Sequence, residues 1–194
     1  MAYTSPVPKL WTETIETHRR EVSDAIVETT AALVGERGLL EVTMSEIAEE
    51  TGIGRATLYK YFPDVQSILL AWHDRKITGH LAQLADVRDR GDTAGERLER
   101  VLETYALLSR HADHDRGLME LLHRDPAIGR AHRQLHKMIT HLVAEAAEAG
   151  EVRDDVPPDE LASYCINALG GGPHPNAAVQ RLVQVTLSGL RPQT

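Results

Sequence analysis

The chain has 194 residues, of which 42% are hydrophobic and 26% charged, an ordinary composition for a globular protein of one or two small domains. Aromatic side chains make up only 4%, so the core must consist mainly of Leu, Val, Ile and Ala, which suits packed helices. The single cysteine, Cys165, excludes an intramolecular disulfide and a thiolate metal cluster, and we expect it to be buried as a small hydrophobic residue. We see no charged and then apolar leader and no apolar run of membrane-spanning length, so we expect a cytoplasmic protein.

The chain begins with a proline-containing arm and continues as a long helix. Residues 1–9 include Pro6 and Pro8 and are expected to form a loose terminal arm. From about Trp11, apolar side chains recur at helical spacing, and Gly38 follows as a C-cap. The inner face of this helix is predicted to consist of Val22, Ala25, Ile26, Thr29 and Leu33.

Residues 43–62, TMSEIAEETGIGRATLYKYF, have the features of two short helices joined by a tight turn. Thr43 and Glu46 stand at capping-box spacing, which marks the start of the first helix. Gly52 supplies the backbone conformation that ends this helix and leads into the next. The second helix has an apolar inner face, formed by Ile53, Leu58 and Phe62, and an outer face and tip formed by Arg55, Thr57, Tyr59, Lys60 and Tyr61. This pattern is typical of a helix-turn-helix, in which the second helix enters the major groove of DNA.

Apolar periodicity predicts six further helices, separated by breaks rich in glycine, proline or charge. Their expected positions are residues 65–87, 94–111, 116–123, 127–150, a segment opened by Pro157-Pro158 and stopped by the glycines at 170–172, and residues 176–190. No flexible linker precedes the helix at 65–87, so a tilt of this helix would move the helix-turn-helix directly. We find no internal repeat and no convincing strand.

The last two predicted helices are apolar nearly all the way round. A helix of this kind must be buried against other elements. We predict that the two helices form a four-helix bundle across the two-fold axis of a homodimer, with burial inside the monomer as the alternative. The residues predicted for this interface are Leu161, Cys165, Leu169, Val179, Val183 and Leu187.

The residues from Gly54 to Phe62, preceded by those from Thr43 to Ala48, resemble the DNA-binding domain of the TetR family of transcriptional regulators. The similarity runs from about Arg20 to Leu70. It implies an all-helical homodimer, usually a repressor, that leaves its palindromic operator when a small molecule binds the C-terminal domain. It also implies a DNA-binding surface, to which we assign Thr43, Arg55, Thr57, Tyr59, Lys60 and Tyr61.

The negative charge of the chain bears on this interpretation. The net charge is −8, and up to Asp64 there are six basic against eleven acidic side chains, whereas a DNA-binding domain usually carries a basic surface. Asp64-Val65 stands where the family often has a lysine that anchors a phosphate. Here only the amide terminus of the next helix is expected to do this, with Arg19 and Arg20 as candidates to compensate. The alternative function is a helical small-molecule or metal-binding module whose DNA binding is weak or lost.

Ten histidines are many for a chain of this length. His132 and His136 are spaced as a helical pair that could ligate a metal, but no third ligand stands at a convincing spacing beside them. The other interpretations are histidines in the core with satisfied hydrogen bonds, or polar groups in an otherwise apolar ligand pocket. The predicted pocket consists of Trp72, His73, Tyr105, Met119, His132 and His136.

The sequence therefore predicts an all-α protein of about nine helices in two domains. Residues 1–64 are expected to form the helix-turn-helix DNA-binding domain with its arm, and residues 65–194 a helical effector-binding and dimerisation domain. The expected partners are double-stranded operator DNA, a small-molecule effector and a second copy of the chain. No catalytic or nucleotide-binding motif is found, so we expect neither an enzyme nor a bound cofactor or metal.

Overall fold

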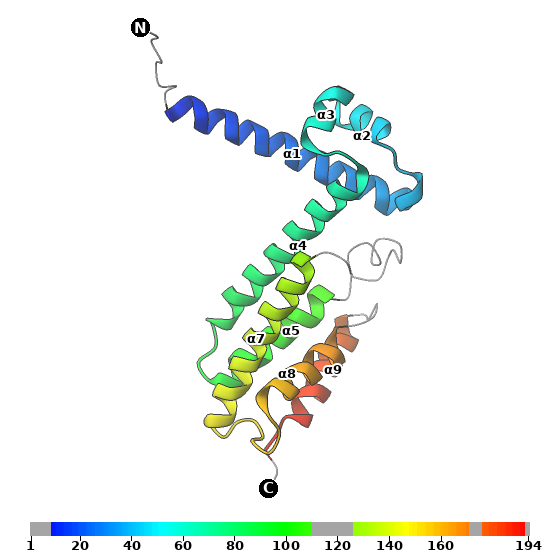
Figure 1. Cartoon of the computed structure of the whole chain (residues 1–194). Helices are drawn as coiled ribbons and strands as arrows, with labels where there is room; N and C mark the ends of the chain where they lie inside the picture. The colour runs from blue at the N-terminus through cyan, green and yellow to red at the C-terminus, as the bar shows by residue number, and fades with distance from the viewer. Residues whose placement is uncertain (1–8, 110–125, 171–175, 193–194) are drawn as a thin grey trace. The chain divides into compact units, whose positions relative to one another are not determined.

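A computed structural model describes residues 9–109, 126–170 and 176–192 (Figure 1). Across these residues the chain is helical and contains no strand, which confirms the predicted all-α class. The helices are α1 (Lys9–Arg37), α2 (Met44–Thr51), α3 (Arg55–Tyr61), α4 (Val65–Arg88), α5 (Ala94–Ser109), α7 (Pro126–Glu148), α8 (Pro158–Leu169) and α9 (Asn176–Gly189), with a 3-10 turn, η1, at Leu39–Glu41. The helix predicted at residues 116–123 lies outside the described residues. No helix in the described part of the chain is long and apolar enough to cross a membrane.

The chain divides into two compact units, Met1–His73 and Asp74–Thr194. The division falls inside α4, so this helix contributes its first turns to one unit and its remaining turns to the other. The domain boundary predicted from the sequence, at Asp64, lies just before α4 begins.

The first unit is built from α1, α2, α3 and the start of α4. Its core consists of fully or almost fully buried aliphatic side chains, namely Ile26, Val27, Leu33, Val34, Val42, Ile47, Leu58, Ile68 and Leu69. The hydroxyl of Thr30, also buried, donates a hydrogen bond of 2.7 Å to the carbonyl oxygen of Ile26 and is thereby satisfied. This core holds α1 against α2, and α2 against α3.

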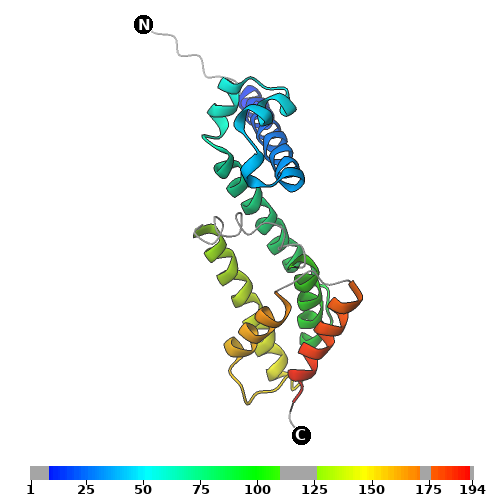
Figure 2. The ribbon, with the colours of Figure 1, turned by 90° about the vertical axis from the view of Figure 1, so that its right-hand side faces the viewer.

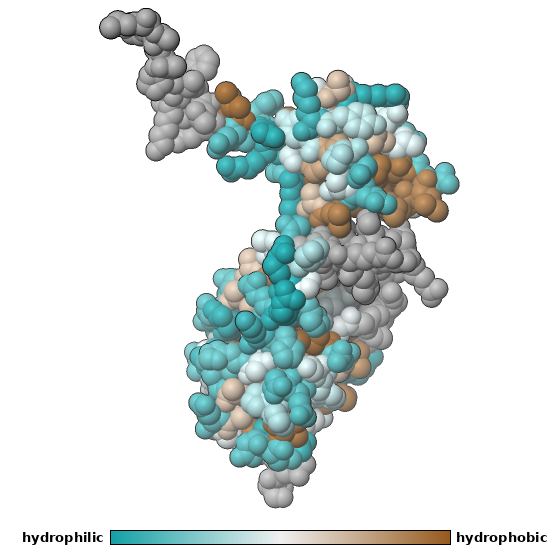
Figure 3. All heavy atoms as spheres, viewed as in Figure 1, coloured by the Kyte–Doolittle hydropathy of each residue, from teal (hydrophilic) through white to brown (hydrophobic). Residues whose placement is uncertain are grey.

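The second unit is a bundle in which α5, α7, α8 and α9 run side by side (Figures 1 and 2). One continuous aliphatic cluster fills it, with Leu98, Leu102, Ile139, Val143 and Val183 among its most buried members. The carboxylate of Glu151 ties the loop after α7 to the start of α5, accepting hydrogen bonds from the Thr93 hydroxyl and the Gly95 amide. The face of this unit that is visible in Figure 3 is mostly hydrophilic, as a helical bundle with a filled core requires.

Candidate DNA-binding interface

The first motif helix begins with a complete capping box. The amide of Glu46 donates to the Thr43 hydroxyl oxygen at 3.3 Å, and the amide of Thr43 donates to the Glu46 carboxylate at 2.9 Å. The Thr43 hydroxyl also donates to this carboxylate, at 2.8 Å, and these bonds lower the pKa of Glu46 below its ordinary value. The single hydroxyl hydrogen of Thr43 is therefore directed into the cap rather than outward, so in this structure Thr43 positions α2.

The turn between the two motif helices depends on a left-handed glycine. Gly52 has φ 68° and ψ 17°, and its amide donates to carbonyl oxygens in the last turn of α2. A side chain is strained in this conformation, whereas glycine adopts it freely. The chain can then reverse within three residues and begin α3 at Arg55.

The second motif helix, α3, has one buried side and one solvent-facing side. Leu58 is fully buried, while Ile53 and Phe62 are only partly buried, so Leu58 is the main anchor of the inner face that the sequence predicted. Of the side chains assigned to the outer face, Arg55, Thr57, Tyr59 and Lys60 are exposed and Tyr61 is partly buried. The Tyr59 side chain has 54% of its surface exposed, which is high for an aromatic residue.

Tyr61 is partly buried and lies next to Arg19 of α1. The guanidinium carbon of Arg19 stands over the Tyr61 ring, 6.0 Å from the ring centre, which is within cation–π range. Arg19 itself is exposed, and so is its neighbour Arg20. The structure thus brings together two residues that lie 42 positions apart in the sequence, and periodicity gave no sign of this pairing.

The Asp64 carboxylate caps the amide terminus of α4, the terminus that we expected to act alone in place of the missing lysine. A carboxylate oxygen of Asp64 accepts a hydrogen bond of 2.7 Å from the Ser67 amide, and the Ser67 hydroxyl donates to the Asp64 carbonyl oxygen at 2.7 Å. This is an N-cap with negative charge at the positive end of the helix dipole. The spacing of Asp64 and Ser67 would have predicted the cap from sequence.

The side chains predicted to line an effector pocket are distributed over both units. Trp72 and His73 belong to the first unit, with ring centres 6.5 Å apart, and Met119 lies outside the described residues. The remaining three are Tyr105, His132 and His136, all in the second unit. The set is therefore not gathered within one unit.

The three side chains in the second unit differ in their surroundings. His132 is exposed, whereas His136 lies between α7 and α8 with its Nε2 atom 3.0 Å from the Ser163 hydroxyl. The Tyr105 hydroxyl donates to the carbonyl oxygen of Ile166 at 3.3 Å, and burial raises the pKa of this tyrosine. Tyr105 and His136 thus have hydrogen-bond partners inside the bundle. Among the described residues, no group of three or more His, Cys, Asp or Glu side chains could hold a metal ion.

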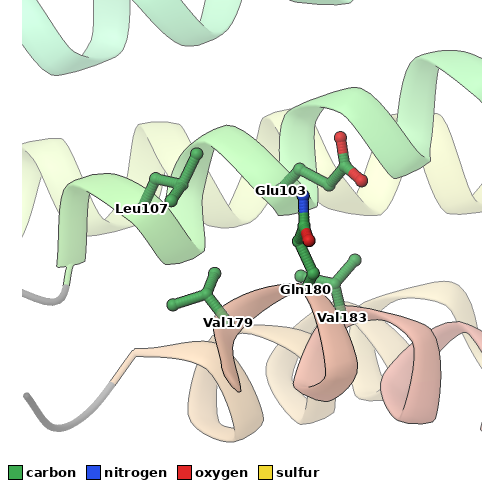
Figure 4. A pocket seen from close by; sticks show the side chains of 5 residues that line it. All are labelled: Glu103, Leu107, Val179, Gln180 and Val183. Carbon is green, nitrogen blue, oxygen red and sulfur yellow. The ribbon is translucent and has the colours of Figure 1, made fainter. Parts of the chain in front are cut away.

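A small pocket of about 160 Å³ lies between α5 and α9 (Figure 4). It is lined by Glu103, Leu107, Val179, Gln180 and Val183, and by none of the six predicted pocket residues. Figure 4 shows the Gln180 side chain reaching from α9 toward Glu103 on α5. Its volume is below the roughly 300 Å³ at which ligand pockets usually begin, so it is too small for a typical effector as it stands.

Most of the residues predicted for the dimer interface are buried inside the chain's own bundle. Leu161, Cys165, Leu169, Val179 and Val183 are between 0% and 6% exposed in the single chain, and Leu187 is partly buried. Burial also raises the pKa of Cys165 to about 12. The reason is that α8 and α9 pack on α5 and α7, and these residues belong to the shared core of the bundle.

Other residues of the same two helices face solvent. Tyr164 on α8 is 46% exposed and Val185 on α9 is 64% exposed. The Tyr164 ring crosses α9 at Gly189, where a Cβ atom would lie 3.4 Å from the tyrosine hydroxyl oxygen. These two side chains are apolar surface that the described residues of α8 and α9 still offer.

The motif consists of a capped helix, a left-handed glycine turn and a second helix with exposed basic and aromatic side chains. These features define the class of the protein, a helix-turn-helix DNA-binding protein. Two comparisons of sequence make the assignment more specific. The family described as "Bacterial regulatory proteins, tetR family" matches residues 26–71, and "Transcriptional regulator SbtR-like, C-terminal domain" matches residues 97–192. The chain belongs to the TetR family of transcriptional regulators.

Individual relatives agree with this assignment. The regulator BetI of Brucella anthropi is 33% identical over 97 residues, which cover 50% of this chain and 46% of the relative, so the chain matches about half the length of that protein. The uncharacterized HTH-type transcriptional regulator Rv2250c of Mycobacterium tuberculosis is 25% identical over 142 residues, covering 70% of this chain and 71% of that protein. The relatives are regulators rather than enzymes.

Solved structures show the same fold. A TetR/AcrR-family regulator from Thermobifida fusca superposes with a TM-score of 0.74 at 20% identity, covering 87% of this chain and 98% of that one. The ketosteroid regulator KstR2 of Mycobacterium tuberculosis superposes with a TM-score of 0.67 at 21% identity, covering 88% and 95%. FadR of Bacillus subtilis, solved in complex with stearoyl-CoA, has a TM-score of 0.66 at 17% identity, covering 86% and 98%.

Proposed function

We propose that the protein is a cytoplasmic, homodimeric repressor that binds a palindromic operator through α3 and is released when a small molecule binds its second unit. The observation that carries this proposal is the two-sided construction of α3. Leu58 anchors its inner side in the core, while Arg55, Thr57, Tyr59 and Lys60 are all exposed on the rest of the helix. These side chains can donate to phosphate oxygens and base edges when α3 lies in the major groove.

The dimer is proposed to form through α8 and α9, using the exposed residues of these helices instead of those predicted from the sequence. Tyr164 and Val185 supply the apolar surface, and the hydrogen bond between Gln184 and Glu99 holds α9 against α5 beside it. An isologous contact of this kind would relate two α3 helices by a two-fold axis, which matches a palindromic operator. Charge introduced at Val185 should therefore produce monomers, visible by sedimentation at micromolar concentration, whereas Glu148→Lys on α7 serves as an exposed control.

The effector is proposed to be a largely neutral, moderately lipophilic organic molecule bound among α5, α7 and α8. Support comes from the partly buried polar groups of Tyr105 and His136 in an otherwise aliphatic bundle, the usual composition of a ligand site. FadR of Bacillus subtilis, which shares the fold, is solved with stearoyl-CoA. A ligand could act on DNA binding only through a difference in its affinity for two arrangements of the helices.

Selection of DNA from a random pool tests the proposed function most directly. The full chain should enrich a palindrome, and Tyr59→Phe and Lys60→Ala should weaken binding to the enriched site. Exposed Glu28→Gln on α1 provides a variant without a proposed contact. If no sequence is enriched, the alternative of a ligand-binding module with weak or lost DNA binding is favoured, in line with the acidic balance of residues 1–64.

A further inference from the structure

The start of α4 and the start of α1 differ in what they offer to a DNA phosphate. At α4, the Asp64 carboxylate accepts a hydrogen bond of 2.7 Å from the Ser67 amide. A phosphate oxygen bound to this amide would have to occupy the same position, about 2.8 Å from the amide nitrogen. A phosphate would also be repelled by the carboxylate charge. One amide at the start of α4 is therefore already used by a residue of the chain itself, and the charge beside it disfavours an anion.

On α1, by contrast, a cation is held beside the recognition helix. Arg19 is exposed, and its guanidinium lies over the ring of Tyr61, the last residue of α3. A cation–π contact of this kind is made with the ring face and requires none of the five guanidinium N–H groups as hydrogen-bond donors. Arginine presents these N–H groups as a rigid fork that matches phosphate oxygens.

Tyr61 is placed to act as a platform. It is partly buried, unlike the other outward side chains of α3, and it is two residues from Tyr59, so the two tyrosines lie on different sides of the helix. Because α3 carries the platform, Arg19 keeps a defined position relative to the recognition helix although it belongs to α1. The long, flexible arginine side chain then loses less conformational entropy on binding DNA.

We propose that Arg19, positioned by its contact with Tyr61, is a phosphodiester-binding site of this protein and supplies the anchoring cation that the start of α4, capped by the Asp64 carboxylate, lacks. In this arrangement Tyr61 is a positioning residue and does not read bases. The inference deepens the proposed DNA-binding function and rests on it. Arg20 is the natural comparison, because it carries the same charge but lies about 100° further round α1.

The first test compares Arg19→Ala with Arg20→Ala by titrating a DNA duplex at several salt concentrations. Each lost phosphate contact should reduce the slope of log affinity against log salt by about 0.9. At 0.15 M salt this lowers the affinity for DNA about 5-fold for one half-site and about 30-fold for a dimer. Arg19→Ala should show this loss, Arg19→Lys a smaller one, and Arg20→Ala little change. Equal slopes for the parent and Arg19→Ala, or a larger loss in Arg20→Ala, would overturn the proposal.

The second test separates a platform from a direct contact. Tyr61→Phe keeps the aromatic face and should bind DNA like the parent, whereas Tyr61→Leu should lose part of the affinity that Arg19→Ala loses. The double variant Arg19→Ala, Tyr61→Leu should bind no worse than Arg19→Ala alone, because the two residues act as a unit. A loss in Tyr61→Phe as large as in Tyr61→Leu would show that the hydroxyl contacts DNA and would refute the platform role.

Measurements on a duplex of arbitrary sequence distinguish this inference from the proposed function. A phosphate contact does not depend on sequence, so the slope change of Arg19→Ala should appear on such a duplex as well as on a selected operator. Failure to enrich an operator would count against the proposed function, while an unchanged slope would count against Arg19 alone. Thermal unfolding of each variant shows whether a loss reflects misfolding.

Discussion

Replacing Asp64 with Asn should tighten the binding of DNA. The asparagine side chain still offers an oxygen to the Ser67 amide, and Asn and Asp are similarly good N-caps, so the start of α4 should remain intact. The change therefore removes one negative charge from the end of the helix that follows the recognition helix. It leaves the proposed contacts of α3 and of Arg19 in place.

The size of the effect follows from electrostatics at an exposed site. For a phosphate about 6 Å from the carboxylate, repulsion in water is about 0.7 kcal/mol, and screening at 0.1 M salt reduces it to about 0.4 kcal/mol. A dimer on a palindrome contains two such sites, which gives about 0.8 kcal/mol, or about 4-fold in affinity. The gain should shrink as salt is raised, because the charge is exposed.

Fluorescence anisotropy with a labelled operator at 0.1 M salt can measure this change. Glu36→Gln is a matched control, since it removes an exposed charge from α1 about 25 Å along the helix from Arg19 and should leave affinity unchanged. If Asp64→Asn binds no more tightly than the parent, or if Glu36→Gln has the same effect, the start of α4 does not lie beside the DNA backbone. The reasoning about Asp64 would then fail.

Three further predictions concern the stability of the two units. Leu58→Ala empties the fully buried position of α3 and should lower the free energy of unfolding of the first unit by about 3 kcal/mol in denaturant titrations, with DNA binding lost in parallel. Gly95→Ala would place a Cβ atom close to the Glu151 carboxylate and should destabilise the second unit by about 1 kcal/mol through lost hydrogen bonds. In a Glu151→Ala background the same change should instead stabilise α5, because alanine favours a helix over glycine. If the change has the same sign in both backgrounds, Gly95 does not contact Glu151. Because the hydrogen bonds from Thr43 lower the pKa of Glu46, the stability that these bonds confer is present above the ordinary pKa of 4.5 and is lost as the pH falls through the lowered pKa. In thermal unfolding, the difference in stability between the parent and Thr43→Val should therefore be larger at pH 7 than at pH 3. An equal difference at both pH values would show that the cap is not formed.

The sequence by itself determined the features that depend on neighbouring residues. The capping box of Thr43 and Glu46 spans three positions, and the turn at Gly52 requires one residue with a left-handed backbone, so both could be predicted and both are present. The all-α class followed from apolar periodicity within single helices. The Asp64 cap is equally local, because it depends only on the three-residue spacing of Asp64 and Ser67.

Tertiary structure alone decided which partner each side chain meets across long distances in the sequence. In α8 and α9, apolar residues lie nearly all the way round, so periodicity could not tell that Cys165 and Val183 face the chain's own α5 and α7 while Tyr164 and Val185 face solvent. Similarly, the contact of Arg19 with Tyr61 depends on how α1 packs against α3. Local hydrogen bonds and backbone preferences act within a few residues and can be read in order along the chain, whereas the orientation of a helix about its axis is set by the shape of the elements packed against it.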